Sequence, residues 1–424
     1  MTSPTDDPRG LLRALFDAAV RAALPDTSIR AHLPAPPKGR TVVVGAGKGA
    51  AQLAQALEAA WDGPLSGVVV TRYGYGAPCE RIAVLEAAHP EPDEAGLLAA
   101  RRLFDEVAGL GPDDLVIALV CGGGSALLPS PPEGLGLDDE LAVNRALLAS
   151  GAPISEMNVV RKHVSTIKGG RLAQAAHPAR VASLIVSDIP GDDPALVASG
   201  PTVPDASTPE EARAIVARYG LDLPAAVRAH LAGADCAAPA PDDPAFARDT
   251  VAIIASAAVS LEAAAAEAKA RGIAAVILSD AVEGESREVA RVLAAITREI
   301  ATRDRPFARP VLLLSGGETT VTIRAKGGKG GRNSEFLLSF ALAIDGLAGV
   351  TALAADTDGI DGSEDNAGGI VDGGTIARIR AAGGDPRALL DANDAWSALD
   401  RAGDLLVTGP TGTNVNDFRA ILIA

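Results

Sequence analysis

The chain has 424 residues and a formal net charge of −16, with 48% apolar residues but only 3% aromatic ones. This length predicts two or three domains, and the apolar content is ample for a packed core. The negative charge argues against binding to duplex nucleic acid or to an anionic membrane surface, because both need a basic footprint.

The three cysteines, Cys79, Cys121 and Cys236, are far apart and match neither a disulfide framework nor a metal-ligand spacing. The polar, acidic first residues do not resemble a signal peptide. No apolar run approaches the roughly 18–20 residues that span a bilayer. We therefore expect a cytoplasmic protein with reduced thiols.

Helical and strand-like segments alternate from the start of the chain. Apolar residues at helical spacing predict a first helix over residues 9–23, and short Val-, Leu- and Ile-rich runs predict buried strands. In the first half we expect strands at 41–44, 68–71, 115–120 and 183–187, and helices at 50–60, 95–108, 140–150 and 157–176.

A Pro-, Ala- and Asp-rich stretch at residues 236–248 is typical of a linker between domains. We expect an N-terminal domain over residues 1–235 and a C-terminal domain over residues 249–424, both α/β with mostly parallel sheets. The second domain is predicted to contain helices at 260–271 and 286–302, and strands at 251–255, 275–279, 311–314, 351–354, 405–407 and 419–423.

Six of the apolar runs end in a loop rich in glycine or aspartate. In open parallel sheets, ligands bind just beyond the carboxyl ends of the strands. Glycines there let backbone N–H groups approach an anion closely. The pattern therefore predicts an α/β enzyme that handles a phosphorylated ligand. The six segments are residues 41–49, 115–125, 181–193, 311–320, 350–362 and 404–414.

The first loop, with Gly45, Gly47 and Lys48, fits G-x-G-x-x-A after a strand. The acidic ribose partner of a dinucleotide site is missing, because Thr71 and Arg72 stand at the end of the second strand. The P-loop spacing is absent as well. Lys48 at a helix N-terminus could meet an anionic ligand. The alternative is a tight strand–helix turn with a surface lysine.

The second loop, Gly122-Gly123-Gly124-Ser125, follows the run LVIALVC. Three consecutive glycines keep side chains away from one spot, and a turn there would direct N–H groups at phosphate oxygens. A purely structural loop is the alternative.

A predicted helix carries Asn158, Arg161, Lys162, His163 and Lys168. Asn158, Arg161 and Lys162 share a face at i, i+3 and i+4 spacing, which suits contacts to an anion. A solvated basic face is the other interpretation. We expect His163 to be structural.

Carboxylates surround a turn at the end of the next strand, where Asp188, Gly191, Asp192 and Asp193 occur together. Such groups could hold Mg²⁺ or accept a hydroxyl proton. Asp188 is the better functional candidate, because Asp192 and Asp193 could instead cap the following helix.

The segment SGGETT with Glu318 is followed by a cationic, glycine-rich loop over residues 326–333 that carries Arg332 and Asn333. Such a loop could close on a transferring phosphoryl group, or it could be a disordered surface loop. Asp356, Asp358 and Asp361 resemble a cation-binding turn without the EF-hand pattern.

Together these segments resemble the glycerate 2-kinase family, whose C-terminal half is called MOFRL and whose members are often labelled hydroxypyruvate reductase. The resemblance extends from VVGAGKGAAQLA to TGPTGTNVNDF, and its most distinctive parts are MNVVRKHVSTIKGGRLA, SDIPGDDPALVASGPTVPD and SGGETTVTIRAKGGKGGRNSEF. It implies two Rossmann-like domains with a cleft between them, and ATP- and Mg²⁺-dependent phosphorylation of D-glycerate at O2.

By the same resemblance, Lys48 and Arg332 match the suspected catalytic cations of the family. Cys121, Gly49 and Ser334 depart from its usual Ser, Ala and Gln. The full predicted site has four groups of residues. The catalytic residues are Lys48, Arg332 and Asp188, and the substrate contacts are Arg161, Glu318 and Asn333. The metal ligands are Asp188, Asp192 and Asp356, and the nucleotide or phosphate contacts are Gly45, Gly47, Gly122, Gly123, Gly124, Ser125, Asn158, Lys162 and Gly191.

Two other functions remain open from the sequence. An NAD(P)H-dependent hydroxypyruvate reductase would use G-x-G-x-x-A, with Arg72 meeting a 2′-phosphate, but the chain lacks a convincing hydride-transfer set. A nucleotide-binding regulatory protein would leave the charged groups at the strand ends unexplained. We expect D-glycerate and ATP as partners, with no nucleic acid or membrane, and a homodimer is compatible with the sequence.

Overall fold

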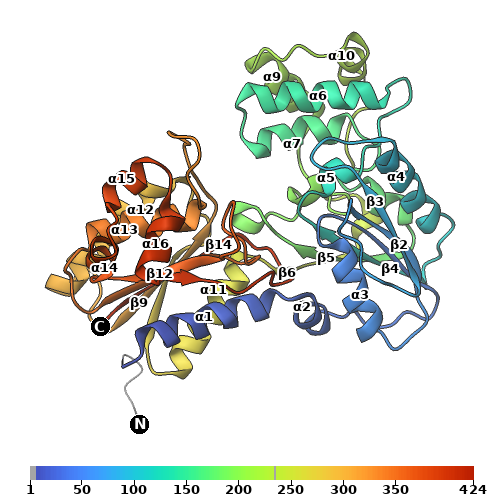
Figure 1. The fold of residues 1–424 in the computed structure, drawn as a ribbon. Coiled ribbons are helices and arrows are strands. Elements are labelled where there is room, and N and C mark those ends of the chain that lie inside the picture. The colour runs from blue at the N-terminus through green and yellow to red at the C-terminus, as the bar shows by residue number, and fades with distance from the viewer. Residues whose placement is uncertain (1–5, 234) are drawn as a thin grey trace. The chain divides into compact units, whose positions relative to one another are not determined.

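The computed structural model describes residues 6–233 and 235–424. The chain forms two compact units, each with its own sheet (Figure 1). The central unit is Pro25–Ile254, and the terminal unit joins the segment that ends at Leu24 to Ala255–Ala424. The first helix thus belongs with the C-terminal half, whereas the sequence analysis assigned residues 1–235 to one domain.

The central unit is built on a six-stranded sheet in the order β3-β2-β1-β4-β5-β6. Strands β1 to β5 pair in parallel. Alternate residues face opposite sides, so Val42 and Val44 pack toward helices α4 and α8, and Val43 packs toward α2 and α3. These layers bury both faces of the sheet, as the apolar runs predicted.

A separate helical group in this unit, formed by α6, α7, α9 and α10, has its own small apolar core (Figure 1, green). The elements of the central unit are α2 (Pro25–Ala31), β1 (Thr41–Ala46), α3 (Ala50–Ala60), β2 (Ser66–Arg72), β3 (Ile82–Ala87), α4 (Glu94–Val107), β4 (Leu115–Cys121), α5 (Gly124–Leu127), α6 (Leu137–Ser150), α7 (Ile154–His163), α8 (Arg171–Ala176), β5 (Arg180–Val186), α9 (Pro209–Arg218), α10 (Ala225–Ala232), β6 (Thr250–Ala255) and the short 3₁₀ turns Pro190–Asp192, Val197–Ser199 and Pro244–Phe246.

The predicted helix over residues 157–176 is wrong in its middle, because the chain leaves the helix after His163. Ser165 Oγ accepts hydrogen bonds from two following N–H groups, and Gly169 and Gly170 adopt φ of +64° and +83°. Lys168 therefore lies outside the helix and pairs with buried Glu140 at 2.5 Å.

The terminal unit holds a second six-stranded sheet in the order β13-β12-β11-β14-β9-β7. Helices α1 and α11 pack on one face, and α12, α13, α14 and α16 pack on the other. The α/β class with two units is confirmed. The expectation of mostly parallel strands fails for this sheet, where β9 pairs in parallel with β7 but antiparallel with β14.

The elements of the terminal unit are α1 (Pro8–Ala23), α11 (Ala257–Ala270), β7 (Ala274–Ser279), β8 (Gly284–Glu285), α12 (Ser286–Arg303), β9 (Val311–Gly317), β10 (Thr319–Thr320), α13 (Arg332–Ala343), β11 (Val350–Asp356), β12 (Gly368–Asp372), α14 (Thr375–Ala381), α15 (Pro386–Asp391), α16 (Ala395–Ala402), β13 (Leu405–Leu406) and β14 (Asp417–Ile423). In the described part of the chain, no helix has the length and apolar character that crossing a bilayer requires.

Candidate active site

The loop after β1 is joined directly to the loop after β4. The N–H group of Lys48 donates to the carbonyl of Gly122 at 2.8 Å, and the N–H group of Gly49 donates to Cys121 Sγ at 3.2 Å. Because these N–H groups are used within the fold, the group that this loop offers to a ligand is the Lys48 side chain. The two glycine-rich segments thus form one structural assembly.

Close packing accounts for the first two glycines of the fingerprint. A Cβ atom on Gly45 would lie 2.5 Å from the carbonyl oxygen of Leu119, and one on Gly47 would lie 2.3 Å from Cys121 Sγ. Both distances are too short for any side chain. That Gly45 and Gly47 contact phosphate stays a prediction.

Lys48 and Asp188 both border the glycine segment after β4. A Cβ atom on Gly122 would lie 1.9 Å from Asp188 Oδ2, and one on Gly123 would lie 3.0 Å from Lys48 Cγ. Gly123 also has a φ of +82°, which favours glycine. Because Gly122 and Gly123 have no side chains, the Lys48 and Asp188 side chains can both lie against this backbone, at the carboxyl ends of β1, β4 and β5.

His89 lies at the same place, although the sequence analysis did not single it out. A Cβ atom on Gly123 would lie 3.1 Å from His89 Nε2. Burial, followed by the charges of Lys48 and Arg72, lowers the pKa of His89, which favours a neutral imidazole at neutral pH.

A hydrogen-bonded chain links Ser125, Asn158 and Arg161. Ser125 Oγ lies 2.8 Å from Ser199 Oγ, which donates to Asn158 Oδ1 at 3.0 Å. Arg161 donates through Nε to Asn144 Oδ1 at 2.9 Å and through Nη1 to Asn158 Oδ1 at 3.4 Å. The structure thus brings these three predicted residues together.

Lys162 is fully buried and forms an ion pair with Asp205. Burial lowers the pKa of Lys162 to about 8, against the opposing charge of Asp193. A phosphate contact by Lys162 would have to replace that pair, and it stays a prediction.

Gly191 and Asp192 lie in the 3₁₀ turn after β5, both with positive φ. The neighbouring Asp193 accepts a hydrogen bond from the Ala195 N–H at 3.0 Å. That bond closes a local turn rather than capping an α-helix. The proposed ligand roles of Gly191 and Asp192 stay predictions.

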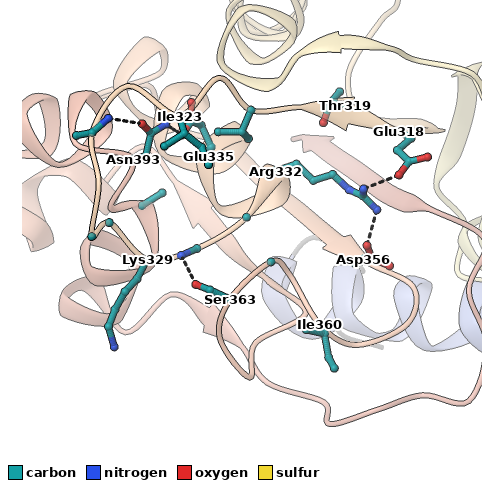
Figure 2. Close-up of a pocket in the computed structure, with 18 of the residues that line it drawn as sticks. Glu318, Thr319, Ile323, Lys329, Arg332, Glu335, Asp356, Ile360, Ser363 and Asn393 are labelled. Atoms are coloured by element: carbon teal, nitrogen blue, oxygen red, sulfur yellow. Dashed lines mark hydrogen bonds and ion pairs between the residues drawn. The ribbon is translucent and has the colours of Figure 1, made fainter. Parts of the chain in front are cut away.

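In the terminal unit, three carboxylates surround the guanidinium group of Arg332, the first residue of α13. Nε donates to Asp417 at 2.7 Å, Nη1 to Glu318 at 2.7 Å and Nη2 to Asp356 at 2.6 Å. Figure 2 shows Arg332 reaching toward Glu318 and Asp356. Although burial alone would lower the pKa of Arg332, Asp417 and Asp356 raise it above its ordinary value, so the side chain stays cationic.

Arg332, Glu318 and Asp356 line a pocket of about 830 Å³ within the terminal unit. The glycine-rich loop forms another of its walls and is tied down at Lys329. The N–H group of Lys329 donates to Asp394 at 3.2 Å, its ammonium group pairs with Glu364 at 3.3 Å, and its carbonyl accepts from the Trp396 N–H at 3.0 Å. Opening of this loop would break these contacts.

Asp356 carries a perturbed carboxyl group. Burial, followed by the charge of Asp358, raises the pKa of Asp356 to about 8, against the opposing effect of Arg332. An additional cation would favour the ionised form. Asp356 and Asp358 therefore offer the carboxylate oxygens that a hard divalent cation requires as ligands.

Asp361 fixes the start of α13. Its carboxylate accepts hydrogen bonds from the N–H groups of Asn333 at 2.9 Å and Ser334 at 2.7 Å. Asn333 also donates through Nδ2 to Asp417 at 2.8 Å, so its fully buried side chain is directed into the protein. A substrate contact by Asn333 stays a prediction.

We expect Asp361→Ala to lower the free energy of unfolding by about 2–3 kcal/mol, because two buried N–H groups lose their acceptor. Denaturant unfolding measures this loss. Asp365→Ala, an exposed change in the same segment, should shift stability by less than about 0.5 kcal/mol. Equal effects of the two substitutions would contradict the assigned role.

The predicted metal ligands are divided between the units, with Asp188 and Asp192 in the central unit and Asp356 in the terminal unit. Within residues 6–233 and 235–424, no three side chains of His, Cys, Asp or Glu are gathered as ligands for one ion. The predicted metal ligands remain predictions.

The fold defines an α/β protein with one parallel and one mixed six-stranded sheet. A family model described as "Domain of unknown function (DUF4147)" matches residues 11–232, and one described as "MOFRL family" matches residues 311–417. The chain is 39% identical to the D-glycerate 2-kinase of Thermotoga maritima over 97% of its own length and 98% of the relative's.

A crystal structure of glycerate kinase from Thermotoga maritima superposes with a TM-score of 0.91, at 38% identity over 99% of this chain and 100% of the other. A relative from Agrobacterium vitis, 54% identical over 98% of this chain and 94% of its own, is named provisionally as a hydroxypyruvate reductase. The chain belongs to the glycerate kinase family, which confirms the resemblance found in the sequence.

Proposed function

We propose that the protein is an ATP-dependent D-glycerate 2-kinase that forms 2-phosphoglycerate in the cytoplasm. The observation that supports this most directly is the meeting of Lys48 and Asp188 at the bare backbone of Gly122 and Gly123. A fixed cation can stabilise the charge of a transferring phosphoryl group, and a carboxylate can accept the proton of the attacking hydroxyl. The names of the relatives support the substrate.

In this proposal Lys48 stabilises phosphoryl charge, and the loop Gly122 to Ser125 contacts phosphate oxygens. The network through Asn158 orients Arg161, which would receive the carboxylate of glycerate. Its guanidinium retains donors beyond the two that contact Asn144 and Asn158.

Magnesium bound with ATP would neutralise phosphate charge during transfer. In the central unit, the side chains that could hold it are Asp188 and Asp192, and the candidate in the terminal unit, taken by itself, is Asp356. Carboxylate oxygens are the ligands that Mg²⁺ prefers, so the donor chemistry fits.

A hydroxypyruvate reductase is the rival function, and the name of the Agrobacterium vitis relative favours it. Hydride transfer to a keto acid needs a histidine oriented by a carboxylate. Within the described residues, His89 has no hydrogen-bond partner, and the ring nitrogens of His163 contact no carboxylate. The geometry therefore supports the kinase better.

The test is to incubate the protein with D-glycerate, ATP and Mg²⁺ in the presence of enolase but without phosphoglycerate mutase. Because enolase acts on 2-phosphoglycerate, phosphoenolpyruvate should appear at once, and EDTA should stop its formation. Appearance only after mutase is added would mean phosphorylation at O3. Oxidation of NADH or NADPH with hydroxypyruvate, and no phosphoryl transfer, would establish the reductase instead.

A further inference from the structure

Three side chains with donor nitrogens meet at the ends of three neighbouring strands in the central unit. Lys48 follows β1, Arg72 ends β2 and His89 follows β3, and these strands are adjacent in the sheet. His89 lies close enough to Lys48 and Arg72 for both charges to act on its ring. Within the described residues, none of the three side chains makes a hydrogen bond or an ion pair.

These donors lack partners among the described residues although the full chain has 54 acidic side chains against 38 lysines and arginines. Arg72 even carries a buried Nε atom with no hydrogen-bond partner among the described residues. Burying a polar group without a partner costs free energy. A cluster of unpaired donors is therefore suited to an anion that is added from outside.

Arg72 is held in place by an aromatic ring rather than by an acid. Its Cζ atom lies 3.4 Å from the centre of the Tyr75 ring, which is a cation–π contact. The loop that carries Tyr75 is fixed by Glu86, whose carboxylate accepts from the N–H groups of Gly74 at 3.2 Å and Gly76 at 3.0 Å. Tyr75 thus positions the guanidinium and leaves its N–H groups available.

His89 is held in a comparable way. Asp93 accepts hydrogen bonds from the N–H group of Ala88 at 3.2 Å and from the Tyr73 hydroxyl at 2.8 Å. These bonds fix the backbone just before His89. The imidazole edge is then directed at Gly123, where Lys48 also lies.

We propose that Arg72 and His89 join Lys48 in binding the phosphate chain of the nucleotide. The inference rests on the proposed kinase function and adds two residues to its nucleotide site. A polyphosphate carries several charges along its length and can engage three separated donors, whereas the single carboxylate of glycerate engages one guanidinium fully. The same cluster could in principle receive either anion, so the test separates them.

The test measures binding of ADP and of D-glycerate by calorimetry to the full-length protein and to Arg72→Gln, His89→Asn and Tyr75→Leu. We expect Arg72→Gln and His89→Asn each to weaken ADP binding about tenfold or more, the order expected for one hydrogen bond to a charged group. Tyr75→Leu should weaken it by a smaller factor, because Arg72 remains but is less well positioned. Binding of glycerate should change less than about twofold.

The matched controls are Arg102→Gln and His177→Asn, which change exposed side chains of the same unit and should leave ADP binding unaltered. Thermal unfolding of each variant shows that the fold is kept. Weakened glycerate binding with unchanged ADP binding would overturn the inference, and so would unchanged binding of both. ADP binding does not depend on which hydroxyl is phosphorylated. If the kinase assay fails while the variants bind ADP more weakly than the unaltered protein does, the proposed kinase function is refuted but the inferred phosphate-binding site is supported.

Discussion

Replacing Lys48 with methionine is expected to lower kcat by a factor of roughly 10²–10³, the usual cost of losing one preorganised charge contact to a transition state. The side chain is half-buried and makes no hydrogen bond or ion pair among the described residues, so the folded state gains little from its charge. The free energy of unfolding should therefore change by less than about 1 kcal/mol. The measurement is kcat at saturating ATP, Mg²⁺ and D-glycerate.

Lys38→Met is the matched control, because Lys38 is exposed and lies in the same unit. It should retain wild-type kcat. If Lys48→Met also retains it, the assignment of Lys48 to catalysis fails. A large loss of stability in Lys48→Met would instead mean that the lysine has a structural role.

The strands that bear Lys48, the glycine segment and Asp188 could be predicted because they are buried on both faces. A strand such as Leu115–Cys121 has only buried residues, so it appears as an uninterrupted apolar run. The residues just after such a run are then placed at the ligand-binding edge of a parallel sheet. For this reason Lys48 and Asp188, more than 100 residues apart in the chain, were correctly expected near the same edge.

His89 was missed because its strand was missed. β3 is an edge strand of the central sheet and is buried only at its two ends, with Ala83 and Glu86 exposed to solvent. Its apolar run, residues 82–85, is short and ends directly at Glu86. Had residues 82–87 been recognised as a partly exposed edge strand, His89 would have been assigned to the same edge of the sheet as Lys48 and Arg72.

The direction of the strands in the terminal unit could not be deduced from burial. The last strand, β14, enters the sheet between β11 and β9 and runs antiparallel to both. An apolar run shows that both faces are covered but not which way the chain passes through the sheet. The inserted C-terminal strand is also what brings Asp417 to Arg332, a partner that local sequence around Arg332 does not reveal.

Arg332→Ala is expected to lower kcat by a factor of roughly 10²–10³, because the preorganised guanidinium on the pocket wall is removed. Unlike Lys48, Arg332 also neutralises buried Asp417 and Asp356, so a loss of about 1–3 kcal/mol in stability should accompany the effect. Arg332→Lys keeps a positive charge but not the fork that reaches three carboxylates at once.

The two effects can be separated by measuring kcat well below the unfolding temperature of each variant. Arg332→Lys should recover most of the stability while kcat stays at least about tenfold below wild type, since a lysine cannot reproduce the directed N–H groups. Arg324→Ala, an exposed change in the loop before α13, should alter neither quantity. If kcat of Arg332→Lys returns to the wild-type value together with stability, Arg332 serves only to neutralise the buried carboxylates, and its place among the catalytic residues is lost.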